Sequence, residues 1–355
     1  MDKAGRHDAG DPALGSLAGE EFRAGRGGAL AGAELKALNR LDDRQALLSV
    51  AVDVAMIAVT AWVALRWWSA WTVLPAMLVM ASRQHALVII AHEAVHYRLF
   101  SGRLANEIVG RLAGYAVGIS MCTYRVVHRL HHNHLYGPSD PDMPLMAGYP
   151  RGRLYLVRKL AKDLCGLGAW RNFAYFFGAP GLNRETGAAA RPLIDTSERL
   201  GRQALADRWA MLAVQAGLLG LALSGGWWRE YLLLWVVPLL TIFQVLLRLR
   251  AVLEHGAPAN PAEVRQAART NHCPGPLRWL LFPHAVNYHL EHHLYPAIPH
   301  YNLPKAHALL AARGFLDDAE VRPVGATLRR IFADPVPDPN PDPESPPGPA
   351  SGQTA

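Results

Sequence analysis

The sequence predicts an all-α integral membrane protein with four transmembrane helices in two hairpins and a helical cap on the cytosolic side that holds a histidine-rich site. The 355-residue chain is 51% hydrophobic and only 18% charged. Four apolar runs are each long enough for a helix that crosses about 30 Å of hydrocarbon. They lie at 46–65, 71–91, 209–228 and 231–247. Short connections within each pair favour hairpins. A soluble protein with four buried helices is the alternative interpretation.

Tryptophans and basic residues predict how these spans are oriented. Tryptophans at 67, 68, 71, 227, 228 and 235 lie near the two short connections, where amphipathic rings favour the membrane interface. Each short connection holds one basic residue, whereas residues 1–44 hold seven and residues 97–207 hold fifteen. The positive-inside rule therefore predicts that both of these segments, and the C-terminal third, lie on the cytosolic side.

A single membrane domain, 45–330, is expected between two flexible ends. Residues 1–44 are rich in Gly, Ala and charge and do not resemble a secretory signal. Residues 331–355 contain DPVPDPNPDPESPPGP and are predicted to be disordered. Within the domain, 104–121 is apolar but interrupted by Glu107 and Arg111, which favours a helix lying in the interface over a fifth crossing.

Two charged residues interrupt the first two spans. Asp53 and Arg83 lie seven and eight residues from the cytosolic ends at 46 and 91, so antiparallel helices would bring them to one level. An unpaired charge at that depth is costly, which predicts an intramembrane ion pair. The alternative is that each side chain reaches the headgroups separately.

Histidine is the residue that the composition singles out. Eight of the 16 histidines lie in three clusters, HEAVH (92–96), HRLHH (128–132) and HLEHH (289–293). Spacings of three and four residues place the imidazoles of each cluster on one helix face. An even number of predicted crossings separates the clusters, so all three can converge on the cytosolic side. The three cysteines form no CxxC pair and indicate neither a disulfide framework nor a cysteine-held metal.

These clusters predict a site for two metal ions. The candidate ligands are His92, His96, His128, His131, His132, His289, His292 and His293, with His255 after the fourth span as a ninth. Nine imidazoles exceed what one tetrahedral ion can use, and imidazole suits zinc, copper and iron alike. Residues expected to orient these imidazoles are Glu93, Asp140, Asp142, Glu254, Asn287 and Glu291.

Two other classes of protein fit parts of this pattern. Residues 92–96 also form an HExxH motif, in which two histidines hold zinc and the glutamate is the general base of a metalloprotease. That site would leave at least five clustered histidines unexplained. A metal transporter is the other alternative, but transporters place their ligands near the bilayer midplane, whereas these clusters lie beyond the ends of the spans.

HEAVH, HRLHH and NYHLEHHLYP, in this order and around two hairpins, resemble the three histidine boxes of the integral-membrane fatty acid desaturase superfamily. The resemblance covers about 45–310, and RQHAL, DPD and PHAVNYHLEHHLYP are similar to the bacterial acyl-desaturase branch. It implies a multi-pass protein of a bacterial cytoplasmic membrane, with both termini cytosolic. It also implies a non-haem di-iron centre that uses O2 to place a double bond in a lipid- or thioester-linked acyl chain.

The same resemblance assigns the eight box histidines, and His255, as iron ligands. Some members have an asparagine four residues before that isolated ligand, where this sequence has Ala251. His134, His272, His284 and His300 do not occupy expected ligand positions. The superfamily also contains hydroxylases and ketolases, so oxidation of an alkane, a carotenoid or an amphiphilic secondary metabolite is the alternative activity.

The expected partners are a lipid or acyl-carrier substrate, the membrane and a separate electron donor. The chain has no cysteine quartet, no Gly-rich dinucleotide fingerprint and no HPGG-type haem segment, so a ferredoxin, rubredoxin or cytochrome must supply electrons. Basic residues cluster at Arg151, Arg153, Arg158, Lys159 and Lys162. They could meet anionic headgroups or a phosphopantetheine carrier, although positive-inside charge alone explains them. No nucleic-acid partner is expected.

Overall fold

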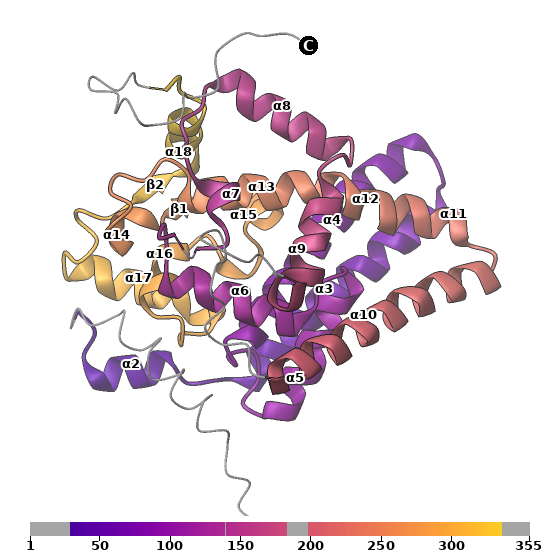
Figure 1. Ribbon diagram of the computed structural model, residues 1–355, viewed down its shortest axis with the longest axis horizontal. Coiled ribbons are helices and arrows are strands. Elements are labelled where there is room, and N and C mark those ends of the chain that lie inside the picture. Colours follow the sequence, from indigo (N-terminus) through magenta and orange to yellow (C-terminus); the bar gives the residue numbers. More distant parts are fainter. Residues whose placement is uncertain (1–28, 139, 183–197, 336–355) are drawn as a thin grey trace, which may run out of the picture.

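The protein is mostly helical and is built around one central helix, α4 (Figure 1). The computed structural model describes residues 29–138, 140–182 and 198–335. The longer helices are α3 (Asp43–Arg66), α4 (Ala70–Val95), α5 (Arg103–Ala116), α6 (Met121–Asn133), α8 (Arg153–Leu164), α9 (Ala169–Leu182), α10 (Glu198–Ser224) and α13 (Ile242–His255). The rest of the predicted lead and tail, 1–28 and 336–355, lies outside the described residues.

Short elements fill the remainder of the described chain. The short helices are α2 (Gly32–Leu38), α7 (Met143–Met146), α11 (Trp228–Tyr231), α12 (Val237–Leu240), α14 (Val264–Ala267), α15 (Gly275–Leu281), α16 (His289–Leu294), α17 (Leu303–Ala312) and α18 (Val324–Ile331). A π-helical turn, η1 (Leu232–Val236), and two 3-10 turns, η2 (Pro283–Ala285) and η3 (His300–Asn302), connect them. Strands β1 (Thr270–His272) and β2 (Val321–Pro323) pair in parallel, with Thr270 opposite Val321.

Among the residues that the structure describes, three stretches of helix are long and apolar enough to cross a membrane. They are Gly32–Arg66, Ala70–Val95 and Trp228–His255, which contain the first, second and fourth predicted spans. The third predicted span lies in α10, a helix of 27 residues whose first half carries several charged side chains and which is not among the three. The structure therefore supports three of the four spans by length and composition.

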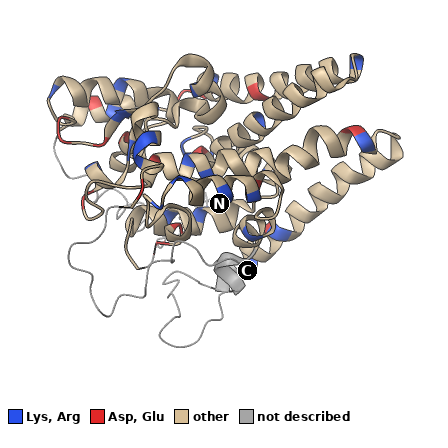
Figure 2. Cartoon of the chain, turned by 90° about the horizontal axis from the view of Figure 1, so that it is seen from above, with Lys and Arg blue, Asp and Glu red and all other residues tan. Residues whose placement is uncertain are grey.

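The long helices project from the body of the molecule as two pairs, along which charged residues are sparse (Figure 2). Helix α3 exposes a row of large apolar side chains: Leu47, Leu48, Val52, Val54, Val59, Trp62 and Leu65. A surface of this kind on a soluble protein would be strongly unfavourable, but it suits contact with lipid. The alternative of a soluble protein with four buried helices is therefore wrong for α3.

Helix α4 occupies the centre of the fold. All of its residues from Met80 to Val95 are buried, and it packs against α3, α5, α6 and α13. The helix continues past the predicted end of the second span at 91, and it ends at the first histidine cluster. The membrane hairpin and the first pair of candidate ligands therefore form one rigid element.

The ion pair predicted inside the first hairpin is confirmed. Arg83 Nη1 lies 2.8 Å from Asp53 Oδ1, and both side chains are almost fully buried. His284 Nε2 lies 2.6 Å from the other oxygen of Asp53, and the Arg83 guanidinium stacks on the Trp279 ring at 4.0 Å. Neither side chain reaches the headgroups alone, because a third element, the segment around η2, completes the network.

The fourth predicted span is not one regular helix. It consists of α11, the π-helical turn η1, α12 and α13, and the chain leaves helical geometry at Thr241. Pro238 has no N–H to donate to the preceding turn, so a local change of helix type is expected there. The Trp235 carbonyl accepts a hydrogen bond of 2.7 Å from Gln84 Nε2, which ties the irregular segment to α4.

Two short helices bear on the predicted boundaries. Helix α5 covers most of 104–121, and its 14 residues span about 21 Å, too short to cross the bilayer, as predicted. Helix α2 lies within the segment 1–44 that was expected to be flexible, so the prediction is wrong for 32–38. Leu38 packs in the same apolar cluster as Leu303 and Leu310, a long-range contact that the lead's composition does not reveal.

Candidate metal centre

Nine histidines from four helices meet at the C-terminal end of α4. Helix α4 contributes His92 and, at its C-cap, His96; α6 contributes three, α13 ends at His255, and α16 contributes three. Within α6 and α16 the spacings of three and four residues direct the side chains from one face, as the sequence predicts. The set forms two groups that could each hold a metal ion: His92, His96, His128, His132 and His292; and His131, His255, His289 and His293.

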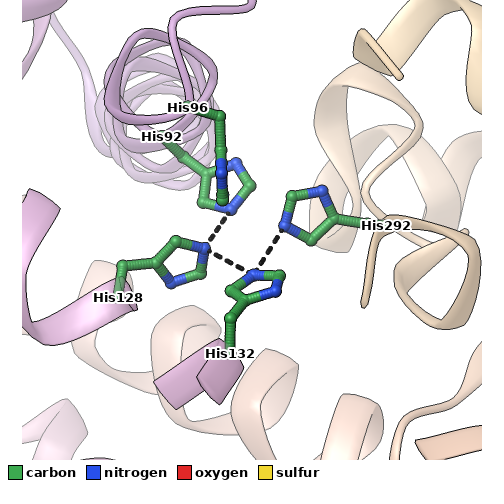
Figure 3. Close-up of side chains that lie close together, drawn as sticks. All are labelled: His92, His96, His128, His132 and His292. Carbon is green, nitrogen blue, oxygen red and sulfur yellow. Dashed lines mark hydrogen bonds between the residues drawn. The ribbon is translucent and has the colours of Figure 1, made fainter. Parts of the chain in front are cut away.

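The first group surrounds a common point (Figure 3). Its candidate ligand atoms lie within 4.8 Å of one another. His128 Nε2 is 2.8 Å from His92 Nε2 and 3.0 Å from His132 Nε2, which is itself 3.0 Å from His292 Nε2. Two nitrogens that bind one ion at about 2.1 Å and at a right angle lie about 3 Å apart. The observed spacing is therefore that of nitrogens on one coordination shell.

The second group has the same geometry. His255 Nε2 lies 2.8 Å from His289 Nε2 and 3.2 Å from His131 Nε2. His293 Nε2 lies 3.1 Å from His289 Nε2. His132 and His293, one from each group, stack with their ring centroids 4.2 Å apart, so the two groups are immediate neighbours.

The hydrogen bonds of two ring nitrogens show why a cation fits here. His131 Nδ1 lies 3.0 Å from Asp140 Oδ1, and His255 Nδ1 lies 3.2 Å from the Ala267 carbonyl. Both oxygens only accept, so in the neutral imidazoles the N–H is on Nδ1 and the lone pair is on Nε2. The two Nε2 lone pairs then face each other at 3.2 Å, an arrangement that a bound cation makes favourable.

The electrostatic environment of the histidine boxes favours the neutral imidazole, which is the form that binds a metal ion. Burial lowers the pKa of His128, His132, His292 and His293 well below the ordinary value, and neighbouring imidazoles lower it further. These rings are therefore neutral near pH 7, with a lone pair available to a metal. Burial also disfavours the charged form of His131, but the adjacent Asp140 and Asp142 outweigh it and raise its pKa.

Four of the predicted orienting acids lie against the histidines. Asp140 contacts His131 as described, and Asp142 lies 3.6 Å from the same nitrogen. Glu93 Oε1 lies 3.5 Å from His92 Nδ1. Glu254 Oε2 lies 3.6 Å from His289 Nε2. These distances make Asp140 the closest of the four to its imidazole.

The other two predicted orienting residues hydrogen-bond elsewhere. Asn287 donates to the Asn271 carbonyl at 3.2 Å. Glu291 accepts from the Thr270 hydroxyl and lies 2.6 Å from His307 Nδ1. The structure therefore places Asn287 and Glu291 against the β1 and α17 segments rather than against one of the nine histidines.

The sequence analysis missed a buried polar layer beneath the site. Arg250 Nε lies 2.8 Å from Glu254 Oε1, and Arg250 Nη1 lies 3.4 Å from His85 Nε2. The Tyr124 ring lies 5.5 Å from that of His128. The spacing of Arg250 and Glu254, four residues apart on one helix, is the signal that could have revealed the pair.

The four histidines excluded from the ligand set lie outside both groups. His284 contacts Asp53, while His300 donates its backbone N–H to Glu93 and has Nε2 3.0 Å from Ser49 Oγ. His134 and His272 are exposed. His300 therefore contacts Glu93, the residue next to the candidate ligand His92, and is not itself a member of either group.

A cavity of about 520 Å³ adjoins the centre. Its buried end is lined by His128, His131, His255 and His289, and aromatic and aliphatic side chains form much of its wall. Pockets of about 300–1,000 Å³ are usual for small-molecule ligands. A substrate in this cavity would lie beside both groups of histidines.

Comparison with known proteins agrees with this geometry. The profile of the fatty acid desaturase family matches residues 65–322, a range that contains all nine histidines. The chain belongs to the fatty acid desaturase family. It is therefore an oxidoreductase of a membrane-associated family, and the protease and transporter alternatives are wrong.

Relatives of this desaturase-family protein differ in the reactions that their names state. It is 29% identical over 281 residues to dihydrorhizobitoxine desaturase of Bradyrhizobium elkanii, covering 75% of each chain. It is 24% identical to a chloroplastic omega-6 fatty acid desaturase of Arabidopsis thaliana, covering 77% of this chain and 60% of the relative. It is 27% identical to a beta-carotene ketolase of Paracoccus sp. (strain PC1), covering 62% of this chain and 72% of the relative.

Proposed function

We propose that the protein is an O2-dependent desaturase that introduces a double bond into an acyl chain, with two iron ions held by the nine histidines. The observation that carries the proposal is the pair of adjacent histidine groups whose Nε2 atoms face common points beside a cavity. The first ion would be held by the group containing His92 and the second by the group containing His255. When bound, such a pair supplies the activation of O2 and accepts the electrons of the two C–H bonds.

The residues around the ligands have a defined part in this chemistry. Asp140 and the Ala267 carbonyl hold N–H groups on the Nδ1 atoms of His131 and His255, which keeps both Nε2 atoms free to bind. The cavity wall confines the chain and limits the access of water, so positioning of the chain selects the carbon. Desaturation and hydroxylation share the first hydrogen removal, and small differences in placement separate them.

Oxidation to a hydroxylated or ketonic product is the second candidate function. It is favoured by the similarity to the beta-carotene ketolase, which extends over 221 residues. In either case two electrons come from a separate donor, a ferredoxin, rubredoxin or cytochrome, because the sequence carries no electron-transfer segment of its own. The same proposal includes four crossings of a bacterial membrane. Both termini and all three histidine boxes would then lie on its cytosolic side.

The test is expression of the full chain in a bacterial host of known lipid composition, followed by mass spectrometry of all lipids. Loss of two hydrogens from an acyl chain is the expected result. Gain of an oxygen would favour the second candidate instead. His292→Ala in α16 should abolish the change, whereas His134→Ala, at the C-terminal end of α6 and outside both groups, should not. Purified protein with one zinc and no iron would overturn the proposal.

A further inference from the structure

The cavity beside the histidines joins a buried end to an exposed, basic rim. His131, His255 and His289 at one end are each less than 5% exposed. At the other end the lining contains Lys162 and Arg171, both exposed, and the half-buried Lys159. The lining therefore runs from the proposed iron ligands to the protein surface at α8 and the start of α9.

The charges of this lining do not balance. Asp163 and Arg248 form an ion pair, with Arg248 Nη2 3.1 Å from Asp163 Oδ1, and Arg250 pairs with Glu254. Asp142 accepts a hydrogen bond of 2.9 Å from the Tyr175 hydroxyl. No acidic side chain in the described part of the chain pairs with the three cations of the rim. The rim therefore carries three positive charges that an anionic ligand could neutralise.

The wall between rim and histidines is largely apolar. It includes Val88, Val127, Leu145, Met146, Phe176 and Leu247. Beside the rim, Leu164, Leu167 and Trp170 are more than half exposed, a composition that favours the membrane interface. Gly166, between them, lies against the carbonyl of Leu240 in the third membrane-length stretch. The mouth of the cavity is thus placed where an amphiphile in the bilayer can enter.

We infer that the substrate is an amphiphile with an anionic head, held at the rim by Lys159, Lys162 and Arg171 while an alkyl chain extends to the histidines. This inference rests on the proposed function and specifies its substrate class. A neutral hydrocarbon or carotenoid would leave the three cations without a counter-charge. A carboxylate or a phosphate would supply the same chemistry, so the head group is defined by its charge.

Photolabelling tests this inference without turnover. The full chain is placed in nanodiscs of zwitterionic phosphatidylcholine and labelled with diazirine-bearing dodecanoic acid, dodecyl phosphate or dodecanol. The peptides that contain Met146 and Phe176 are then quantified by mass spectrometry. Labelling of these peptides by the anionic probes should exceed labelling by the alcohol about tenfold, because charged hydrogen bonds add more than 1 kcal/mol. Preference for the acid would assign a free carboxylate, and preference for the phosphate a lysophospholipid-like head.

Paired variants separate the rim from the general charge of α8. Lys159→Gln/Lys162→Gln should lose the preference for anionic probes while keeping the labelling by dodecanol, which reports an intact cavity. Arg153→Gln/Arg158→Gln removes the same charge from the same helix outside this cavity and should keep the preference. Equal labelling by all three probes, or equal effects of both pairs, would overturn the inference. Because labelling needs neither iron nor reductant, its failure is distinguishable from failure of the proposed reaction.

Discussion

The contact between Asp140 and His131 determines which ring nitrogen of a proposed ligand remains free. Asp140 also accepts backbone N–H groups from Tyr136 and Asp142, at 2.9 Å each, so its carboxylate is held in place by its own loop. An acceptor fixed in this way selects one tautomer and one ring orientation. The residue acts through His131 and is a positioning residue.

Asp140→Asn should weaken metal binding at the second histidine group by about 10–100-fold. The amide keeps the shape of the side chain but removes the negative charge that favours the N–H on Nδ1. The measurement is iron retention during titration with a chelator. Asp142→Asn is the matched control, because its carboxylate lies 3.6 Å from the same nitrogen and should matter less. Equal iron retention in wild type and Asp140→Asn would contradict this role.

The buried Asp53–Arg83 pair predicts non-additive mutations. Arg83→Leu leaves the Asp53 carboxylate buried with His284 as its remaining partner, which should cost about 3–5 kcal/mol of stability. Adding Asp53→Asn removes the uncompensated charge, so the double variant should be more stable than Arg83→Leu alone. Unfolding of the single and double variants in detergent measures the coupling. Simple additivity would show that the two side chains do not interact.

The lowered pKa of Glu320 should make the stability of the protein depend on pH in the acidic range. Burial would raise its pKa, but hydrogen bonds and charge from Arg322 and Arg269 outweigh burial and hold the pKa below its ordinary value. A lowered folded pKa gives stability that is complete above the unfolded value of about 4.3 and is lost as pH falls through the folded value. Glu320→Gln should therefore be less stable than wild type at pH 7, with the two unfolding midpoints converging in acid.

A second carboxylate serves as the control for that experiment. Glu263 pairs with Arg265 near the surface and is half-exposed, so Glu263→Gln should change the unfolding midpoint little at either pH. If the unfolding midpoints of wild type and Glu320→Gln differed by the same amount at every pH, the contribution of Glu320 to stability would not depend on its charge.

At the scale of elements, the sequence was sufficient to predict the long apolar helices and the helical spacing of the histidines. It did not show where the helical backbone becomes irregular. The spacing of HRLHH and HLEHH places the imidazoles of each cluster on one helix face, as helical geometry predicts. The π-helical turn before Pro238 accepts a hydrogen bond from Gln84, which lies 151 residues earlier in the chain. Such a contact has no local signature. Helix α10 is the predicted crossing that its composition does not support, since its first half carries several charged side chains.

The proposed topology predicts opposite accessibility for Ser224, at the C-terminal end of α10, and Cys165, in the segment that precedes α10. Ser224 lies at its last residue, and if α10 crosses the membrane Ser224→Cys should react with a membrane-impermeant maleimide in intact cells. Native Cys165, which is exposed after α8, should react only after permeabilisation. Both residues are compared in variants that keep one cysteine each. Protection of Ser224→Cys in intact cells, with reaction after permeabilisation, would show that α10 stays on the cytosolic side.

At the scale of the whole molecule, the proposed metal centre joins parts of the chain that the sequence separates widely. The first group alone draws on α4, α6 and α16, and the second on α6, α13 and α16. Box order and the predicted even number of crossings led to the prediction that these side chains converge. The division into groups of five and four was not predictable, because it depends on how α6 directs His131 away from His128 and His132. Arg250 and His85 were missed for the same reason, since their contact spans 165 residues.

This arrangement predicts that metal removal destabilises the part of the fold in which the four helices carrying the nine histidines meet. A ligand that binds only the folded state stabilises it by about 3–4 kcal/mol at 100 to 1,000 times its Kd. Chelation should therefore lower the unfolding midpoint by roughly 6–16 °C, at 2–4 °C for each kcal/mol, and added iron should restore it. His292→Ala should lower the midpoint before chelation and respond less to the chelator, whereas His134→Ala should behave like wild type. An unfolding midpoint that is unaffected by chelation in the iron-loaded protein would mean that the nine histidines are held together by packing alone.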